Sequence, residues 1–346
     1  MAAFFDIALT ADFYRDGRPL YRDTGLDRLD GQERLRLRAL DEHWPELGAD
    51  QLKGANGVIV LTPSVTAASL AQADDLLALV RFGVGYDSVD VEACSRADVL
   101  ACITAGAVDR PVAEATVGWM LALTHHIRTK DRLVCEGGWA ERAAYMGAEL
   151  RQRTFGTIGL GGIARETLRL LSVFGMEKPL AYDPFVDAAA AADLGVELVE
   201  LEDLLARADF VSLHCPLNEA TRGLLDRRRL GLMKEGAYLI NTARGGIVDE
   251  EALYDLLASG HLAGAALDCF ANEPVVEPPP LARLDNVLLA PHAIAWTNEL
   301  FRDIGRTACD AFISLAHGQQ PAKGVLNPEL FDKPSFRAKW ERLRLT

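Results

Sequence analysis

The sequence lacks any pairing pattern among its cysteines. Its 346 residues contain six cysteines, and none of them forms a C-x-x-C pair or shows the spacing of a metal site. This pattern argues against redox chemistry and zinc binding, so we predict no metal site and cysteines that act as small buried hydrophobic residues in a reducing compartment. The chain is also far too long to be a disulfide-stapled miniprotein.

Basic residues are scarce relative to acidic ones, and long apolar runs are missing. With 36 Lys+Arg against 50 Asp+Glu, the formal net charge is −14, which repels phosphate backbones and anionic lipids. No apolar run approaches the roughly 18 residues of a membrane-spanning helix. The opening residues carry Asp6 inside their only apolar stretch and have no basic flank, unlike a secretory signal. We therefore expect a cytoplasmic protein that binds neither nucleic acid nor membrane.

Short apolar runs alternate with helix-like segments along most of the chain. This alternation predicts an α/β protein in which crossover helices join parallel strands, and the length suits two domains of about 150 residues. Five strands are expected in a first block, at Phe4–Leu9, Arg34–Leu40, Gly57–Leu61, Leu76–Val80 and Val99–Ile103.

A second block with the same alternation begins at Arg153. Its six expected parallel strands are Phe155–Leu160, Leu180–Tyr182, Phe210–Leu213, Ala237–Asn241, Ala263–Leu267 and Val287–Leu289. Apolar residues at helical spacing predict one long connecting helix between Ala105 and Arg132, and a further helix from Trp296 to His317.

A glycine-rich turn follows the first strand of this second block. Gly159, Gly161 and Ala164 form a G-x-G-x-x-A pattern in which the first glycine permits a tight turn and the second lets the backbone approach a pyrophosphate. The N–H groups of Gly162 and Ile163 then face the anion. Asp183 ends the next strand, where a carboxylate accepts hydrogen bonds from an adenosine ribose. The alternative is a phosphate-free turn with Asp183 as a turn former before Pro184.

Three later motifs, taken with this turn, resemble the D-isomer-specific 2-hydroxyacid dehydrogenases over roughly residues 50–330. The segment NTARGGIVD, which contains Arg244, is similar to the family's substrate-binding arginine motif. The segment LDCFANEP, which contains Glu273, is similar to its catalytic-glutamate motif, and Pro291-His292-Ala to its catalytic-histidine motif. The order and spacing of the motifs also match.

These three side chains suit the implied chemistry on physical grounds. The planar fork of Arg244 binds the carboxylate and carbonyl of a 2-keto acid bidentately, which Lys cannot do. Reduction needs a proton near neutral pH, which His292 supplies best when a carboxylate such as Glu273 holds the ring and stabilises its protonated form. Taken singly, each has a plainer interpretation: a surface Arg that caps a loop, a turn Glu before Pro274, and a core His.

The resemblance also implies further site residues. Those on the cofactor side are His214, Cys215, Pro216, Thr221, Thr242, Ala243 and Asp268, each of which could instead shape a loop. Val84 and Gly85 lie in a Gly-rich turn between an expected strand and a helix start, which resembles the family's substrate loop and where backbone N–H groups can hold a carboxylate. Trp296 replaces a residue that is usually small, so it either narrows the substrate pocket or packs at a domain interface.

Together these features predict two doubly wound parallel-sheet domains. A Rossmann-type NAD-binding domain (106–295) is inserted into a smaller flavodoxin-like substrate domain (1–105 and 296–335), followed by a C-terminal tail (336–346). The resemblance implies hydride transfer between NAD(H) and a D-2-hydroxy acid/2-keto acid pair, in a homodimer that packs through the helix near 112–130. An NAD-sensing corepressor without turnover and oxidation of phosphite or formate remain as alternatives.

Overall fold

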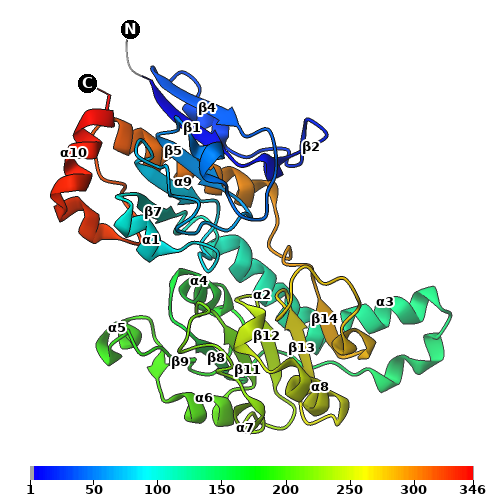
Figure 1. The fold of residues 1–346 in the computed structure, drawn as a ribbon. Coiled ribbons are helices and arrows are strands. Elements are labelled where there is room, and N and C mark those ends of the chain that lie inside the picture. The colour runs from blue at the N-terminus through cyan, green and yellow to red at the C-terminus, as the bar shows by residue number, and fades with distance from the viewer. Residues whose placement is uncertain (1–3, 346) are drawn as a thin grey trace. The chain divides into compact units, whose positions relative to one another are not determined.

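The computed structural model describes residues 4–345, which divide into two compact units (Figure 1). Unit 1 comprises Met1–Val108 and Trp296–Thr346, and unit 2 comprises Asp109–Ala295. Unit 2 is therefore an insertion in the sequence of unit 1. The first division falls three residues after the boundary expected from the sequence, and the second falls at the expected position.

Unit 1 is built on a five-stranded parallel sheet. Its strands, in spatial order, are β4 (Leu35–Ala39), β1 (Phe5–Leu9), β5 (Gly57–Val60), β6 (Ala78–Arg81) and β7 (Leu100–Ile103). Counted along the chain this order is 2-1-3-4-5, which is the flavodoxin-like arrangement and confirms that prediction. A short antiparallel hairpin, not predicted from the sequence, pairs β2 (Tyr14–Arg15) with β3 (Arg18–Pro19).

The helices of unit 1 cover this sheet. They are α1 (Val91–Arg96), α9 (Asn298–Ala316) and α10 (Pro334–Leu343). The α9 helix begins where the Thr297 hydroxyl accepts a hydrogen bond from the Leu300 N–H (3.0 Å).

The segment expected to be a C-terminal tail contains most of α10 instead. Phe336 is fully buried, and the indole N–H of Trp340 donates to the Leu315 carbonyl (2.8 Å). These two side chains are four residues apart and so share one face of the helix, which the many charged neighbours conceal in the sequence. Residue 346 lies outside the described residues.

Unit 2 is built on a seven-stranded parallel sheet. Its strands, in spatial order, are β10 (Glu197–Leu198), β9 (Leu180–Tyr182), β8 (Phe155–Ile158), β11 (Phe210–Leu213), β12 (Tyr238–Asn241), β13 (Gly264–Leu267) and β14 (Val287–Leu289). Counted along the chain this order is 3-2-1-4-5-6-7, the Rossmann arrangement extended by one strand, and it confirms the predicted fold class. The sequence predicts all of these strands except β10, which is only two residues long.

Helices cover both faces of this sheet (Figure 1). They are α2 (Asp109–Thr124), α3 (Ile127–Cys135), α4 (Gly162–Leu171), α5 (Ala188–Asp193), α6 (Leu201–Arg207), α7 (Arg227–Leu230) and α8 (Glu250–Ala258). In the described part of the chain, no helix has the length and apolar character needed to cross a membrane.

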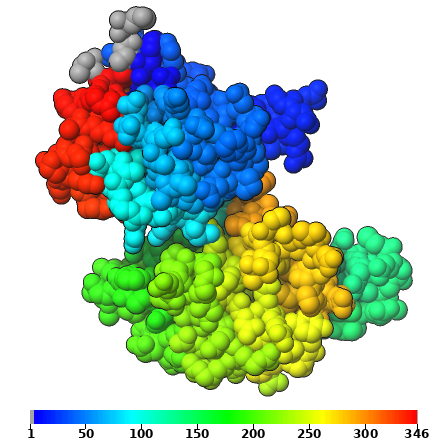
Figure 2. Space-filling view, in the orientation of Figure 1, coloured from blue at the N-terminus to red at the C-terminus, as the bar shows by residue number. Residues whose placement is uncertain are grey.

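The single long helix predicted between Ala105 and Arg132 is wrong. The structure has two helices there, α2 and α3, because His126 adopts a left-handed conformation (φ 51°) that an α-helix cannot continue. No glycine or proline marks this break in the sequence. Figures 1 and 2 show α3 and the following 3₁₀-helix η4 (Trp139–Ala144) as a lobe that projects from the edge of unit 2.

Candidate functional site

The predicted cofactor and catalytic residues of unit 2 follow the carboxyl ends of its strands. Gly159 follows β8, Asp183 follows β9, and His214 follows β11. Thr242, Asp268 and the Ala290–His292 segment follow β12, β13 and β14. Because all seven strands are parallel, these carboxyl ends lie along one edge of the sheet, where open α/β sheets bind their ligands.

The two glycines of the turn after β8 differ in their surroundings. Gly159 has φ 94°, and a Cβ there would lie 2.8 Å from the His214 carbonyl oxygen, so any side chain would collide with the loop after β11. A Cβ at Gly161 would meet nothing within 4 Å. The N-cap residue of α4 is Gly161, which has no side chain to cap the helix. The turn therefore ends at a helix N-terminus with open space beside Gly161.

The space beside Gly162 is occupied by the carboxylate of Asp109, which also belongs to unit 2. A Cβ at this residue would lie 2.1 Å from Oδ2 of Asp109, the first residue of α2. A side chain at position 162 would have to displace this carboxylate, which places a negative charge next to the glycine-rich turn.

Asp183 joins the end of β9 to that turn. Its Oδ2 accepts a hydrogen bond from the Leu160 N–H (2.8 Å), and its Oδ1 accepts one from the Phe185 N–H (2.9 Å). Each carboxylate oxygen has a second lone pair for a further donor. The side chain is thus fixed in place and still able to accept bonds from ribose hydroxyls.

The loop after β11 contains a buried histidine. The His214 ring contacts the Ser212 hydroxyl through Nε2 (2.9 Å), while its Nδ1 is buried without a hydrogen-bond partner among the described residues. Burial lowers the pKa of His214 to about 4 and raises the pKa of the neighbouring Cys215 thiol to about 11. Thr221, by contrast, uses its hydroxyl inside this loop, where it donates to the Pro216 carbonyl (2.6 Å).

Arg244 is positioned by two residues that the sequence analysis did not single out. The fully buried Asn241 donates from Nδ2 to the Arg244 carbonyl (2.8 Å) and accepts from the Ala243 N–H (3.0 Å). A Cβ at Gly245 would lie 1.9 Å from the Phe270 carbonyl carbon, so only glycine lets the two loops approach this closely. Both residues lie inside the NTARGGIVD motif, and this location is the feature of the sequence from which their role could have been inferred.

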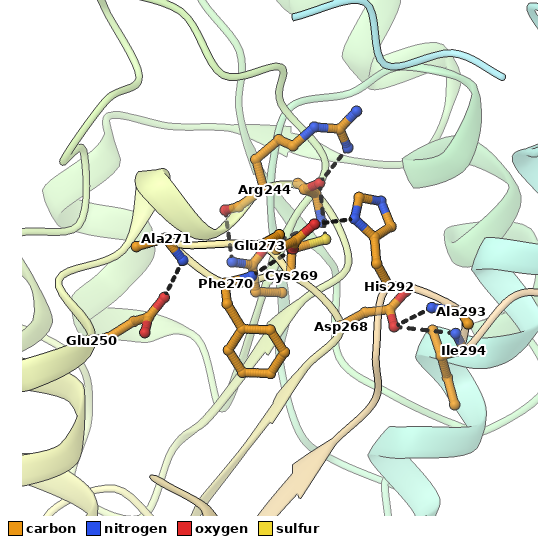
Figure 3. Close-up of polar contacts among 12 residues, drawn as sticks. Arg244, Glu250, Asp268, Cys269, Phe270, Ala271, Glu273, His292, Ala293 and Ile294 are labelled. Atoms are coloured by element: carbon orange, nitrogen blue, oxygen red, sulfur yellow. Dashed lines mark hydrogen bonds and ion pairs between the residues drawn. The ribbon is translucent and has the colours of Figure 1, made fainter. Parts of the chain in front are cut away.

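His292 and Glu273 form a hydrogen-bonded pair (Figure 3). Glu273 Oε2 lies 2.8 Å from His292 Nδ1, and Glu273 Oε1 accepts from the Phe270 N–H (2.8 Å). Burial alone would raise the pKa of Glu273, but the hydrogen bonds from His292 and Phe270, together with the Arg244 charge, outweigh burial and lower it. Glu273 is therefore an ionised partner for the imidazole at neutral pH.

Asp268 holds the backbone of His292, which has an uncommon left-handed conformation (φ 54°). The Asp268 carbonyl accepts from the His292 N–H (2.8 Å), and its Oδ1 accepts from the N–H groups of Ala293 (2.8 Å) and Ile294 (3.1 Å). Asp268, predicted from the resemblance as a cofactor contact, thus also positions the histidine loop.

The predicted substrate residues of unit 1 are placed on two loops. Val84 and Gly85 lie in the turn between β6 and α1, in the strand–turn–helix order that the sequence predicts. The α1 helix begins at Val91 and is capped by Asp90, whose carboxylate accepts from the Ala93 N–H (2.8 Å).

The indole of Trp296 packs edge-on against Tyr21 (ring centroids 5.7 Å apart) and Phe301 (5.2 Å). It nevertheless remains 53% exposed, so a large part of it is open to contacts.

Comparison with known proteins agrees with this geometry. Residues 117–293 match the family described as "D-isomer specific 2-hydroxyacid dehydrogenase, NAD binding domain". A D-3-phosphoglycerate dehydrogenase from Archaeoglobus fulgidus is 37% identical over 280 residues, which is 81% of this chain and 53% of the relative. The chain belongs to the D-isomer-specific 2-hydroxyacid dehydrogenase family.

Other members of this family differ in how much of their length they share with the chain. A hydroxypyruvate reductase from Thermotoga maritima is 40% identical over 250 residues, covering 72% of this chain and 80% of that protein. A glyoxylate reductase structure from Paecilomyes thermophila aligns with a TM-score of 0.79 at 25% identity, covering 95% of this chain and 99% of that one. The chain spans only about half the length of the curated D-3-phosphoglycerate dehydrogenases it matches.

The residues present fit the NAD-binding domain of this family. The N-cap residue of α4 is a glycine, the space beside Gly161 is open for a pyrophosphate, and Asp183 has lone pairs left for ribose hydroxyls. The buried Thr242 hydroxyl has no hydrogen-bond partner among the described residues, so it is free to bond a ligand at the same edge.

Proposed function

We propose that this protein is an NAD-dependent D-2-hydroxyacid dehydrogenase that transfers a hydride between NAD(H) and a D-2-hydroxy acid/2-keto acid pair. The observation that supports it best is the His292–Glu273 pair, whose members follow the adjacent strands β14 and β13, with Arg244 after the next strand, β12. Three neighbouring strand ends thus carry the cation, the acid and its partner that keto-acid reduction needs.

Each side chain has a distinct part in the proposed reaction. Bound NADH supplies the hydride that reaches the carbonyl carbon. Arg244 binds the substrate carboxylate and carbonyl through its planar fork. Because Glu273 accepts from Nδ1 of His292, the other ring nitrogen, Nε2, carries the proton that goes to the developing alkoxide. Oxidation of the hydroxy acid uses the same groups in reverse.

A substrate-binding role of Arg244 would distinguish a dehydrogenase active site from a site that only binds the cofactor. A panel of 2-keto acids with NADH should give turnover, and Arg244→Lys should lower kcat/KM steeply because it keeps the charge but loses the fork. The exposed Arg283→Lys is a matched control in the same unit. Equal loss of NADH binding in Arg244→Lys, measured by fluorescence titration, would move Arg244 to the cofactor.

His292 is tested in the same assay. Removal of a general acid costs about 10²–10⁴ in rate, so His292→Ala should lose most of its kcat while NADH still binds. A variant with near wild-type kcat, or a wild-type protein that turns over no acid of the panel, would refute the proposed reaction.

We also propose that NADH is preferred over NADPH. The 2′-phosphate of NADPH would bring nearly two negative charges against the Asp183 carboxylate, and Pro184, Phe185, Val186 and Asp187 offer no cation to bind it. A preference of about tenfold corresponds to about 1.4 kcal/mol. Asp183→Ser should narrow the gap in kcat/KM. A wild-type preference for NADPH would show that Asp183 is not the ribose residue.

The remaining substrate residues and the location of the protein stay predictions. The residues proposed to contact the substrate acid in unit 1 are Val84, Gly85 and Trp296. The six cysteines are all free, which supports a reducing, cytoplasmic compartment, and cell fractionation tests this location.

A homodimer is the proposed assembly. The lobe formed by α3 and η4 (Figure 2) exposes apolar side chains, among them Val134 (65% exposed) and Trp139 (66%). Light scattering after gel filtration should give the mass of two chains for wild type and a lower mass for Val134→Glu. Val173→Glu, at another exposed valine of unit 2 (83%), should stay dimeric. A monomeric wild type would refute the assembly.

A further inference from the structure

We propose that Cys269, Glu273 and His292 form a binding site for Zn²⁺ that inhibits the enzyme. The sequence predicts no metal site, because the three residues have no recognisable metal spacing and meet only in the folded loops. The inhibition rests on the function proposed above, whereas metal binding does not depend on it.

The three side chains offer one sulfur, one oxygen and one nitrogen to a common point. The ligand atoms of Cys269, Glu273 and His292 all lie within 4.8 Å of one another. Figure 3 shows the sulfur of Cys269 beside the Glu273 carboxylate and the His292 ring. Cys269 is buried, whereas the other two side chains are open to solvent, so an ion reaches the site from the exposed side.

These separations suit a tetrahedral ion after small side-chain movements. Zinc binds thiolate at about 2.3 Å, imidazole at about 2.0–2.1 Å and carboxylate at about 2.0–2.2 Å, which places ligand atoms about 3.3–3.6 Å apart. The Glu273–His292 contact of 2.8 Å must therefore open slightly, and the sulfur must approach from at most 4.8 Å. The thiol now donates to the Ala243 carbonyl (3.3 Å), a weak bond that zinc would replace as the thiol loses its proton.

Local charge also favours a cation. The charge of Glu273 acts on the carboxylates of Asp268 and Glu250, so two further carboxylates lie near the Glu273–His292 pair, and Arg244 is the opposing cation. The donor set itself selects among ions: thiolate with imidazole favours Zn²⁺ over Mg²⁺, which prefers oxygen ligands.

Zinc in this position would block the proposed chemistry directly. The ion takes the lone pair through which Glu273 holds the imidazole and occupies Nδ1 of His292, so the ring can no longer be the imidazolium that donates from Nε2 in the proposed reaction. Three protein ligands leave a fourth position open, as in zinc sites that keep a water ligand. The resulting inhibition should be reversible by a chelator.

The test measures metal binding first, without turnover. Zn²⁺ is titrated into wild type, Cys269→Ser and the control Cys135→Ser, which removes the exposed cysteine. Binding should weaken by about tenfold or more in Cys269→Ser and stay unchanged in Cys135→Ser, and Mg²⁺ should not compete. Co²⁺ bound to wild type should show a thiolate-to-metal charge-transfer band.

A second measurement addresses inhibition. Micromolar-range Zn²⁺ should lower NADH oxidation with a keto acid, each variant being compared with its own metal-free rate, and chelation should restore it. Equal zinc affinity in wild type and Cys269→Ser would overturn the site. A cobalt spectrum of wild type without the thiolate band would also overturn it, and this second result does not depend on the folding of the serine variant. Absence of turnover with every acid would refute the proposed function and leave the binding result standing.

Discussion

Acidification should destabilise the protein through the buried imidazole of His214. Burial lowers the pKa of this ring from 6.5 to about 4, so the unfolded chain takes up the proton at a higher pH than the folded chain. The free energy of unfolding should therefore be unaffected by His214 above pH 6.5, fall as the pH drops from about 6.5 to about 4, and level off below that range. A shift of about 2.5 pKa units corresponds to about 3 kcal/mol, and because the residue as a whole is only partly buried, although its Nδ1 is buried, the expected loss at pH 4.5 is about 2 kcal/mol.

The assay compares denaturant unfolding of wild type and His214→Gln at pH 7.5 and pH 4.5. Acid titration of carboxylates acts on both proteins, so only the difference between them reports on His214. His214→Gln should lose about 2 kcal/mol less than wild type between the two values of pH. His317→Gln, at an exposed histidine, should behave as wild type. Parallel pH dependence of wild type and His214→Gln would refute the reasoning.

Three further substitutions test the site. Glu273→Gln removes the ion partner of the protonated imidazole, so the pH above which keto-acid reduction declines should move downward; an unchanged pH–rate profile would make Glu273 a turn residue. Gly159→Ala should lower the free energy of unfolding by about 2–4 kcal/mol, because the added Cβ meets the His214 carbonyl oxygen at 2.8 Å. Gly195→Ala, also at positive φ but in open space, should cost about 1 kcal/mol in the same thermal unfolding measurement. Equal costs of the two substitutions would contradict the clash at Gly159. Trp296→Ala should change the ranking of keto acids with small and bulky side chains; an unchanged ranking with a lower Tm would indicate a packing role only.

The strands were predictable because their hydrophobic pattern is local. The apolar run Phe210–Leu213 is buried along its whole length, as central parallel strands are, and the alternating residues of Leu35–Ala39 form an edge strand with one wet face. The break at His126 was not predictable in the same way. Its left-handed backbone has no glycine or proline to mark it in the sequence.

The proposed catalytic residues stand out in the sequence because they lie in motifs, but the residues that support them do not. Asn241 and Gly245 act through a backbone amide, a carbonyl and a close loop approach, which show only when the loops after β12 and β13 are brought together. The same holds for Cys269, whose thiol meets Glu273 through the fold and not through sequence spacing.

The two carboxylates next to His292 differ in environment, and this difference separates their roles. Burial raises the pKa of Asp268, since the hydrogen bonds that it accepts from Ala293 and Ile294 only partly compensate. The half-exposed Glu273 bonds directly to the imidazole, and its pKa is lowered despite its burial. Carboxylates whose pKa values are pushed apart by their surroundings are suited to different tasks. In the proposed reaction Glu273 is therefore the charged partner of the imidazole, while Asp268 fixes the backbone of the loop that carries the ring.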